Sequence, residues 1–237
     1  MLKKKMKLWT KIGIGLLGLM VILCGAFYIY TLDYYRASDY VEALIEASNH
    51  DVQVQGNLTI IRPEVAMDKE VGLAFYPGGK VEARAYTPLL LQLADEGITC
   101  VLIEMPMNLA VFNNDGAEDA FSALPEIKTW YLAGHSLGGA MASAYIEKNS
   151  DGLEGLILLG AYPLNEAEVD TLVLYGTYDI QLDLSSMYLA DEVHEIMNGN
   201  HAQFGDYGIQ EGDGKALISR EEQQRIAVAY IKSFIEK

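Results

Sequence analysis

The segment Gly-His-Ser-Leu-Gly-Gly at residues 134–139 constrains the fold of this 237-residue chain more than any other segment. It follows an apolar run, Thr129 to Ala133, that is typical of a buried strand, and it leads into a segment with helical spacing, Ala140 to Lys148. Where a strand turns sharply into a helix, the two backbones come so close that a Cβ would clash, and glycine lacks that atom. We therefore predict a strand, a tight turn and a helix, with Ser136 at the turn.

Strand-like and helix-like segments alternate along the rest of the chain. Seven apolar or alternating runs are expected to form strands: 52–61, 71–76, 99–104, 129–133, 155–159, 171–175 and 193–197. Five segments have the spacing of helices: 81–96, 117–124, 140–148, 184–191 and 220–236. Such alternation favours a mainly parallel sheet with helices on both faces. We predict a doubly wound α/β domain over residues 51–237, which 51% hydrophobic residues are enough to fill.

The first thirty residues differ in composition from the rest of the chain. Residues 12–30 carry no charge, and their number matches a helix that crosses a bilayer core. Five lysines precede this stretch: Lys3, Lys4, Lys5, Lys7 and Lys11. Because positive charge stays on the cytoplasmic side, we predict a cytoplasmic tail over residues 1–11, a single transmembrane helix over 12–30 in the cell membrane, and an extracytoplasmic domain. Residues 31–50 mix aromatic and acidic residues with alanine and leucine, which predicts a short helical stalk.

Two other interpretations of the N-terminal stretch remain open. A cleaved signal peptide normally has a shorter apolar core and ends in an A-x-A site, which this segment lacks. A lipoprotein would use Cys24, but Leu23 stands where a small residue is expected. A membrane anchor therefore ranks first and a cleaved signal second.

The charge of the remaining chain excludes one class of partner. Residues 31–237 keep 12 of the 17 lysines and arginines and all 33 acidic residues, a formal charge of −21. Such a domain repels nucleic acid and anionic lipid headgroups. Cys24 lies in the predicted span and Cys100 in a predicted strand, so the two do not form a disulfide within the fold.

A serine hydroxyl is a poor nucleophile unless a histidine takes its proton and an acid orients that histidine. His201 follows the last predicted strand, at the carboxyl edge of the sheet where Ser136 also emerges. Asp179 follows the strand that ends at Tyr175, at the same edge, and Asp183 is the alternative acid. The other histidines lie before the first strand, inside the turn or at the start of a strand, and are not expected to serve as the base: His50, His135 and His194.

Two backbone N–H groups are expected to stabilise a developing oxyanion. One belongs to Leu137, directly after Ser136, and the other to the Pro-Gly-Gly turn that follows the strand 71–76. In that turn we favour Gly79 over Gly78 as the donor.

Four segments of the chain resemble one known family. The chain is similar to α/β-hydrolases, and among these to small, lidless, dienelactone-hydrolase-like bacterial proteins. The similarity lies in four motifs: Tyr-Pro-Gly-Gly at 76–79, Met-Pro-x-Asn-Leu-Ala at 105–110, Gly-His-Ser-Leu-Gly-Gly at 134–139 and Asn-His-Ala-Gln-Phe-Gly at 200–205. The order Ser136, Asp179, His201 is the order of that fold. True dienelactone hydrolases carry a cysteine where this chain has Ser136, which favours ordinary ester chemistry.

Several details follow from this resemblance and from the residues nearby. Only residues 160–170 separate two strands where such hydrolases usually carry an inserted lid, so we expect no cap domain and an open site. Asn108 and Phe112 follow a strand and are candidates to line a substrate pocket. The acidic loop that contains Asp206, Glu211 and Asp213 lacks the full spacing of a calcium loop and is expected to be a solvated turn.

The sequence thus leads to an expected function. We expect a membrane-anchored serine hydrolase that cleaves small carboxylic esters through an acyl-enzyme, with no metal, no organic cofactor and no nucleic-acid partner. Two alternatives stay open, namely an acyltransferase on the same fold and a non-catalytic surface-binding protein. The sequence does not indicate an oligomeric state.

Overall fold

The computed structural model describes residues 7–67 and 70–237. The chain divides into two compact units, of which the first ends at Tyr34 and the second, called here the globular unit, extends from Tyr35 to Lys237. In the first unit the helix α1 (Leu8–Leu32) contains the predicted span and extends beyond it at both ends. Within the described residues it is the one helix long and apolar enough to cross a membrane.

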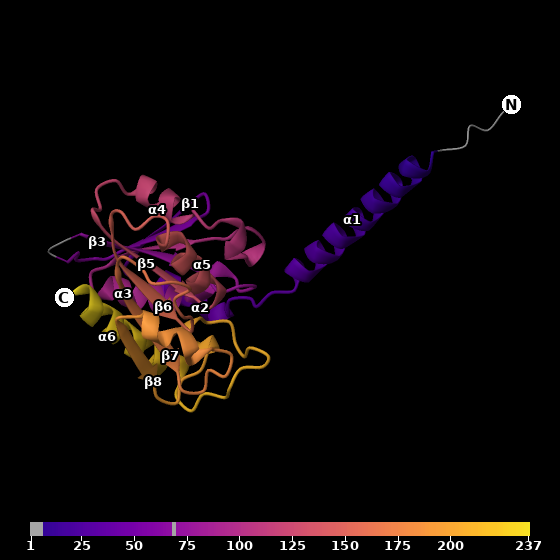
Figure 1. Ribbon diagram of the computed structural model, residues 1–237. Helices are drawn as coiled ribbons and strands as arrows, with labels where there is room; N and C mark the ends of the chain where they lie inside the picture. The colour runs from indigo at the N-terminus through magenta and orange to yellow at the C-terminus, as the bar shows by residue number, and fades with distance from the viewer. Residues whose placement is uncertain (1–6, 68–69) are drawn as a thin grey trace. The chain divides into compact units, whose positions relative to one another are not determined.

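The globular unit is built on a single eight-stranded sheet (Figure 1). The strands lie in the order β1-β2-β4-β3-β5-β6-β7-β8, and the pairs from β4 to β8 are parallel. Their bounds are β1 (Asp51–Gln55), β2 (Leu58–Arg62), β3 (Val71–Tyr76), β4 (Thr99–Ile103), β5 (Thr129–His135), β6 (Leu153–Leu159), β7 (Asp170–Gly176) and β8 (Glu192–Ile196).

Helices cover both faces of the sheet (Figure 1). The α-helices of the globular unit are α2 (Asp39–Ala47), α3 (Thr87–Asp95), α4 (Ala117–Ala123), α5 (Leu137–Ile146) and α6 (Arg220–Ile235). Short 3-10 helices are η1 (Ala83–Tyr86), η2 (Pro106–Asn108), η3 (Ala110–Phe112), η4 (Leu184–Leu189) and η5 (Ala202–Phe204). α2, α3 and α6 share one hydrophobic core, and α4 and α5 share the other.

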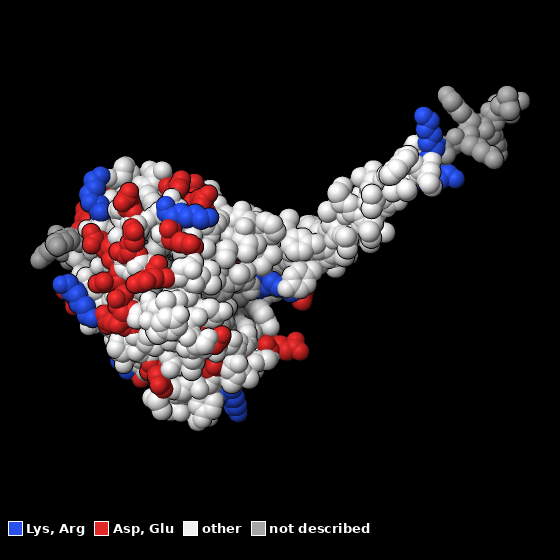
Figure 2. All heavy atoms as spheres, viewed as in Figure 1, with Lys and Arg blue, Asp and Glu red and all other residues white. Residues whose placement is uncertain are grey.

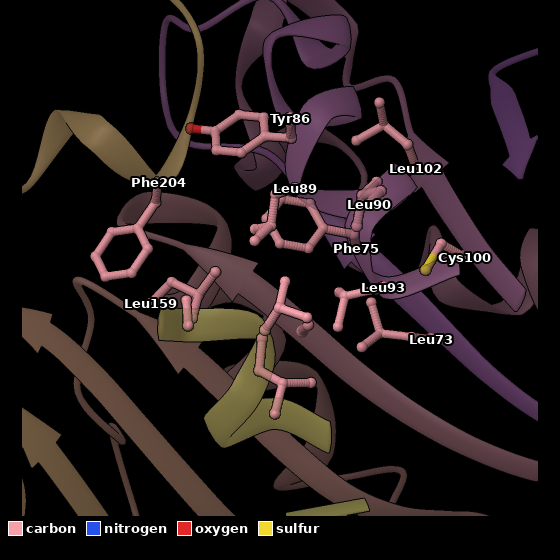
Figure 3. Packing of buried hydrophobic residues seen from close by; sticks show 14 of the residues in the cluster. Leu73, Phe75, Tyr86, Leu89, Leu90, Leu93, Cys100, Leu102, Leu159 and Phe204 are labelled. Carbon is pink, nitrogen blue, oxygen red and sulfur yellow. The ribbon is translucent and has the colours of Figure 1, made fainter. Parts of the chain in front are cut away.

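Alternate residues of the central strands contribute their side chains to the two hydrophobic cores. In β3, Leu73 and Phe75 belong to the core under α3, which Figure 3 shows from close by, whereas Ala74 and Tyr76 belong to the core under α5. Because both faces of β3 are buried, its sequence is a continuous apolar run. The predicted doubly wound α/β fold is confirmed.

Two predicted elements differ in the structure. The run 52–61 is a hairpin of β1 and β2 rather than one strand, because Gly56 adopts a φ of +61° and reverses the chain. β2 then pairs antiparallel with β4 and makes the sheet mixed at that edge. The segment 184–191 forms the 3-10 helix η4, whose first turn is capped by Asp183 through the N–H of Ser185.

Residues 35–50 belong to the globular unit and do not form the separate stalk that we predicted. The apolar side of α2 packs on α3, and Val41 is fully buried. Before α2, Tyr35 donates its N–H to the carbonyl of Lys80 (2.8 Å) and accepts the N–H of Glu82 (2.9 Å). The apolar residues of α2 recur at helical spacing and thus form a face that is stable only against another element.

The carboxyl ends of the parallel strands meet at one edge of the sheet, called here the carboxyl edge. Gly79, Ser136, Asp179 and His201 follow β3, β5, β7 and β8 and come together there. Residues 160–169 between β6 and β7, all of which the structure describes, contain neither helix nor strand. No cap domain is therefore inserted at this point.

Candidate active site

Ser136 lies on a strained turn between β5 and α5. Its φ is +52° and its ψ is −122°, a conformation that residues other than glycine rarely adopt. A Cβ at Gly134 would lie 2.6 Å from backbone atoms of Gly138, and a Cβ at Gly138 would lie 2.3 Å from the carbonyl oxygen of Tyr76. The glycines thus allow the close approach of helix and strand that holds Ser136 clear of the sheet.

His201 and Asp179 form a buried pair at the same edge. His201 Nδ1 lies 2.7 Å from Asp179 Oδ2, and both side chains are almost inaccessible to solvent. Since a carboxylate only accepts, Nδ1 carries a hydrogen, and in a neutral ring Nε2 then presents a lone pair. Within the described part of the chain, Nε2 is buried without a hydrogen-bond partner. The alternative acid, Asp183, instead caps η4.

One pocket of about 280 Å³ joins Ser136 and His201. Its lining consists of Ser136, Leu137, Ala140, Gly160, Ala161, Tyr162, Gln181, Leu182 and His201. A roomier hollow of about 370 Å³ beside α2 contains none of the predicted site residues. The side chains in the smaller pocket, rather than its size, make it the candidate site.

The predicted oxyanion donors lie side by side. A Cβ at Gly79 would lie 2.7 Å from Leu137 Cδ2, so the turn after β3 touches the first residue of α5. The N–H of Leu137 is at a helix start, where N–H groups have no partner within the helix. The Gly78 N–H is already donated to the hydroxyl of Tyr86 (3.0 Å), so of the two glycines in this turn Gly79 remains the candidate donor.

A comparison of sequences with family models places the chain in a family. The model described as the alpha/beta hydrolase family matches residues 72–225. This chain belongs to the alpha/beta hydrolase family. No curated protein is similar to it in sequence.

Solved structures share the fold of this hydrolase at low sequence identity. A dienelactone hydrolase from Anabaena variabilis is 14% identical, with a TM-score of 0.57 over 80% of this chain and 98% of that one. A dienelactone hydrolase-like promiscuous phosphotriesterase from metagenomic libraries is 15% identical, with a TM-score of 0.58 over 79% and 96%. A membrane phospholipase A described as a bacterial virulence factor is 12% identical, with a TM-score of 0.56 over 96% and 98%. The expected resemblance to dienelactone hydrolases is confirmed at the level of the fold, and the family supports a hydrolase in general terms.

The loop that carries His201 in this hydrolase is held by a carboxylate. Asp213 accepts the N–H groups of His201 (3.2 Å), Ala202 (2.8 Å) and Gly214 (2.8 Å). On the other side of the loop, Gln223 of α6 bonds both the N–H and the carbonyl of Asn200. The backbone around His201 is therefore fixed by side chains from two later segments.

The acidic loop is thus not the solvated turn that we expected. Asp206 is buried, binds Arg220 Nη1 at 2.6 Å and accepts a hydrogen bond from Ser38 Oγ, while Asp213 holds the His201 loop. Glu211 alone of the three acids is exposed. Among the residues that the structure describes, no three His, Cys, Asp or Glu side chains gather in the manner of a metal site.

His135 links the turn of residues 77–79, called here the oxyanion turn after its predicted role, to the loop of His201. Its Nε2 lies 3.0 Å from the carbonyl oxygen of His201, which only accepts, so Nε2 carries the hydrogen. Nδ1 then accepts the hydroxyl of Tyr86 at 2.7 Å, and that hydroxyl accepts the Gly78 N–H. Burial, together with the nearby His201, holds the pKa of His135 well below its ordinary value, and burial raises the pKa of Tyr86. The ring is therefore neutral.

Two predicted pocket residues lie away from the pocket, and one residue that was not predicted lies beside the His201–Asp179 pair. Asn108 and Phe112 do not line the pocket of Ser136; Asn108 accepts the Lys80 N–H with its carbonyl (2.7 Å), and Phe112 is half exposed. Gly160, which sequence reasoning missed, has a φ of +52° and packs against the His201–Asp179 pair. No motif marks it, and its position just after β6 is the only sequence signal.

Proposed function

We propose that this protein is a serine hydrolase that cleaves carboxylic esters of small molecules through an acyl-enzyme. One observation carries the proposal: a histidine bonded to a buried carboxylate through Nδ1 has no partner for its other nitrogen among the described residues, in a pocket that it shares with a serine on a strained turn. This arrangement supports Ser136 as nucleophile, His201 as base and Asp179 as the group that orients His201.

The proposed acylation step begins when Ser136 Oγ attacks the ester carbonyl carbon and His201 Nε2 takes the hydroxyl proton. The backbone N–H groups of Leu137 and Gly79 stabilise the oxyanion. Nε2 then gives the proton to the alkoxy oxygen as the C–O bond breaks, and the alcohol leaves. Asp179 stays ionised and stabilises the imidazolium.

Deacylation repeats these steps with water as the nucleophile. His201 Nε2 takes one proton from water while the oxygen of water bonds to the acyl carbon. The proton returns to Ser136 Oγ as the bond between the acyl carbon and Oγ breaks, and the carboxylic acid leaves. The mechanism needs no metal or organic cofactor.

We further propose that α1 anchors the enzyme in the cell membrane, with its lysine-rich end in the cytoplasm and the globular unit outside. The length and composition of α1 support a span, and the lysines support the orientation. The charge of −21 over residues 31–237, of which 12 are basic and 33 acidic, makes a nucleic-acid partner unfavourable.

A fluorophosphonate probe tests the proposed nucleophile. The full-length protein is expected to be labelled, and Ser136→Ala is expected to abolish labelling and to lower hydrolysis of p-nitrophenyl esters by about 10⁴-fold or more. An unlabelled wild-type protein would instead support the non-catalytic binding protein. Product analysis with an added alcohol acceptor distinguishes hydrolysis from acyl transfer, and a series of esters with longer acyl groups defines the pocket.

A further inference from the structure

Exposed apolar side chains of the globular unit gather around the candidate site. They lie in the loops after β4, β7 and β8, and they are between 47% and 93% exposed. We call this set the apolar rim: Met107, Val111, Ile180, Leu184 and Ile209. Single exposed apolar residues are ordinary in proteins, but several from three loops at one edge indicate a surface that is covered in use.

The apolar rim lies next to the pocket of Ser136 at Ile180. Gln181, next to Ile180, lines the pocket and accepts a hydrogen bond from the side chain of Gln210, next to Ile209 (3.1 Å). On the visible face in Figure 2, acidic side chains gather toward the side of the globular unit where the C-terminus lies. The C-terminal Lys237 lines a hollow with Val71 and Thr129, which begin their strands. That side is the amino edge of the sheet, opposite the rim.

The globular unit begins at the same edge as the rim. Tyr35 pairs through its backbone with Lys80 and Glu82, directly after Gly79, and its hydroxyl accepts the N–H of Glu211 (3.1 Å). Only two residues stand between the end of α1 and Tyr35. A chain of three residue steps spans at most about 11 Å when fully extended. If α1 crosses a membrane, the covalent chain therefore keeps Tyr35, at the carboxyl edge, within about 11 Å of the end of α1.

We propose that the apolar rim contacts the membrane that α1 crosses and that the pocket of Ser136 takes acyl esters of lipids from that membrane. This inference rests on the proposed hydrolase function and on α1 as an anchor. Because the globular unit is strongly acidic, apolar side chains rather than electrostatic attraction to anionic headgroups would make the contact. A pocket of about 280 Å³ is too small for a whole lipid, so it holds the ester end while the rest of the acyl chain lies along the rim.

Membrane contact by the rim is testable without catalysis. The full-length protein with Cys24→Ala and Ile209→Cys is labelled with bimane and reconstituted into phosphatidylcholine vesicles that contain doxyl-labelled lipid; the remaining Cys100 is fully buried. We expect quenching at position 209 and none for Val65→Cys, because Val65 is comparably exposed, at 79% against 93%, but lies between β2 and β3 at the amino edge. Equal quenching at both positions, or no quenching at 209, overturns the contact. A rim that binds a protein partner would also leave position 209 unquenched.

The substrate class is tested in the same vesicles. Wild type is expected to release fatty acid from phosphatidylcholine and to hydrolyse p-nitrophenyl acetate. Ile180→Ser combined with Ile209→Ser is expected to lower fatty-acid release about tenfold and to change p-nitrophenyl acetate hydrolysis by less than about twofold. The matched control combines Val65→Ser with Val193→Ser, two exposed residues at the amino edge of the sheet, and is expected to change neither rate.

The outcomes separate the two proposals. Hydrolysis of p-nitrophenyl acetate without fatty-acid release, or equal losses in the rim and control variants, overturns the lipid substrate and leaves the serine hydrolase intact. A protein that hydrolyses neither substrate and is not labelled by a fluorophosphonate overturns the proposed function itself, while quenching at position 209 still decides the membrane contact.

Discussion

At the scale of single residues, the hydroxyl of Tyr86 joins the oxyanion turn to His135. Tyr86→Phe leaves the buried Gly78 N–H and His135 Nδ1 without partners, so we expect a loss of about 1–3 kcal/mol in the free energy of unfolding and a lower kcat. Tyr131→Phe is the control, because Tyr131 is also buried and makes no hydrogen bond through its hydroxyl to the described residues. Urea unfolding and ester kinetics measure both effects. Equal effects of the two variants would contradict the linking role.

The neutral ring of His135 also predicts how stability depends on pH. Its pKa is far below the ordinary value of 6.5 in the folded protein, so below about pH 6.5 the unfolded chain binds more protons than the folded one. His135 therefore makes the free energy of unfolding fall as pH falls, by at most about 1.4 kcal/mol per pH unit. His135→Gln is expected to flatten this dependence between about pH 5 and pH 7. His194→Gln, at a partly exposed position, serves as the control in urea titrations.

At the scale of elements, the turn after β6 must carry glycine. A Cβ at Gly160 would lie 3.0 Å from His201 Nδ1 and 3.2 Å from Asp179 Oδ2, so Gly160→Ala is expected to displace the pair and to lower kcat by about 10²-fold. Gly152→Ala is a matched control, since Gly152 also has a positive φ, of +83°, but has no atom within 4 Å of a new Cβ. Both variants are expected to lose about 1–3 kcal/mol of stability, and only Gly160→Ala is expected to lose activity. Equal activities would mean that the pair tolerates the methyl group.

The loop after β8 depends on Asp213 in a similar way. Asp213→Ala removes the acceptor of three N–H groups around His201, so we expect kcat to fall about tenfold or more while the KM for a soluble ester changes little. Glu211→Ala, at an exposed position of the same loop, is the control. Steady-state kinetics on the full-length protein decides the matter, and a change confined to KM would contradict a role in holding His201.

What could be predicted from the sequence depended on the range of the interactions. The strands, the turn at Ser136 and the pairing of His201 with Asp179 follow from local periodicity and from the rule that parallel strands end at one edge. The hairpin at Gly56 was missed because alternation continues across the turn, although the two residues between the strands, Gly56 and Asn57, are a turn signal. The roles of Asp213 and Gly160 were missed because each depends on contacts between segments that no local pattern relates.

At the scale of the whole molecule, the N-terminal unit decides where the protein resides. If α1 is an uncleaved anchor, the full-length chain of 26.1 kDa is expected to stay in the membrane fraction after an alkaline carbonate wash. Intact mass and immunoblotting of the two fractions measure this. A shorter, soluble product would instead indicate that the N-terminal segment is cleaved as a signal peptide.

The backbone of Ser136 sets a trade-off for the evolution of this protein. Glycine adopts the conformation with a φ of +52° without penalty, whereas serine loses about 1–3 kcal/mol there. Selection for thermal stability alone would therefore replace the proposed nucleophile, and the Ser136→Gly protein is expected to be inactive but to melt at a higher temperature than wild type. If serine is retained at this position, it is retained for activity, although it lowers the stability of the folded protein.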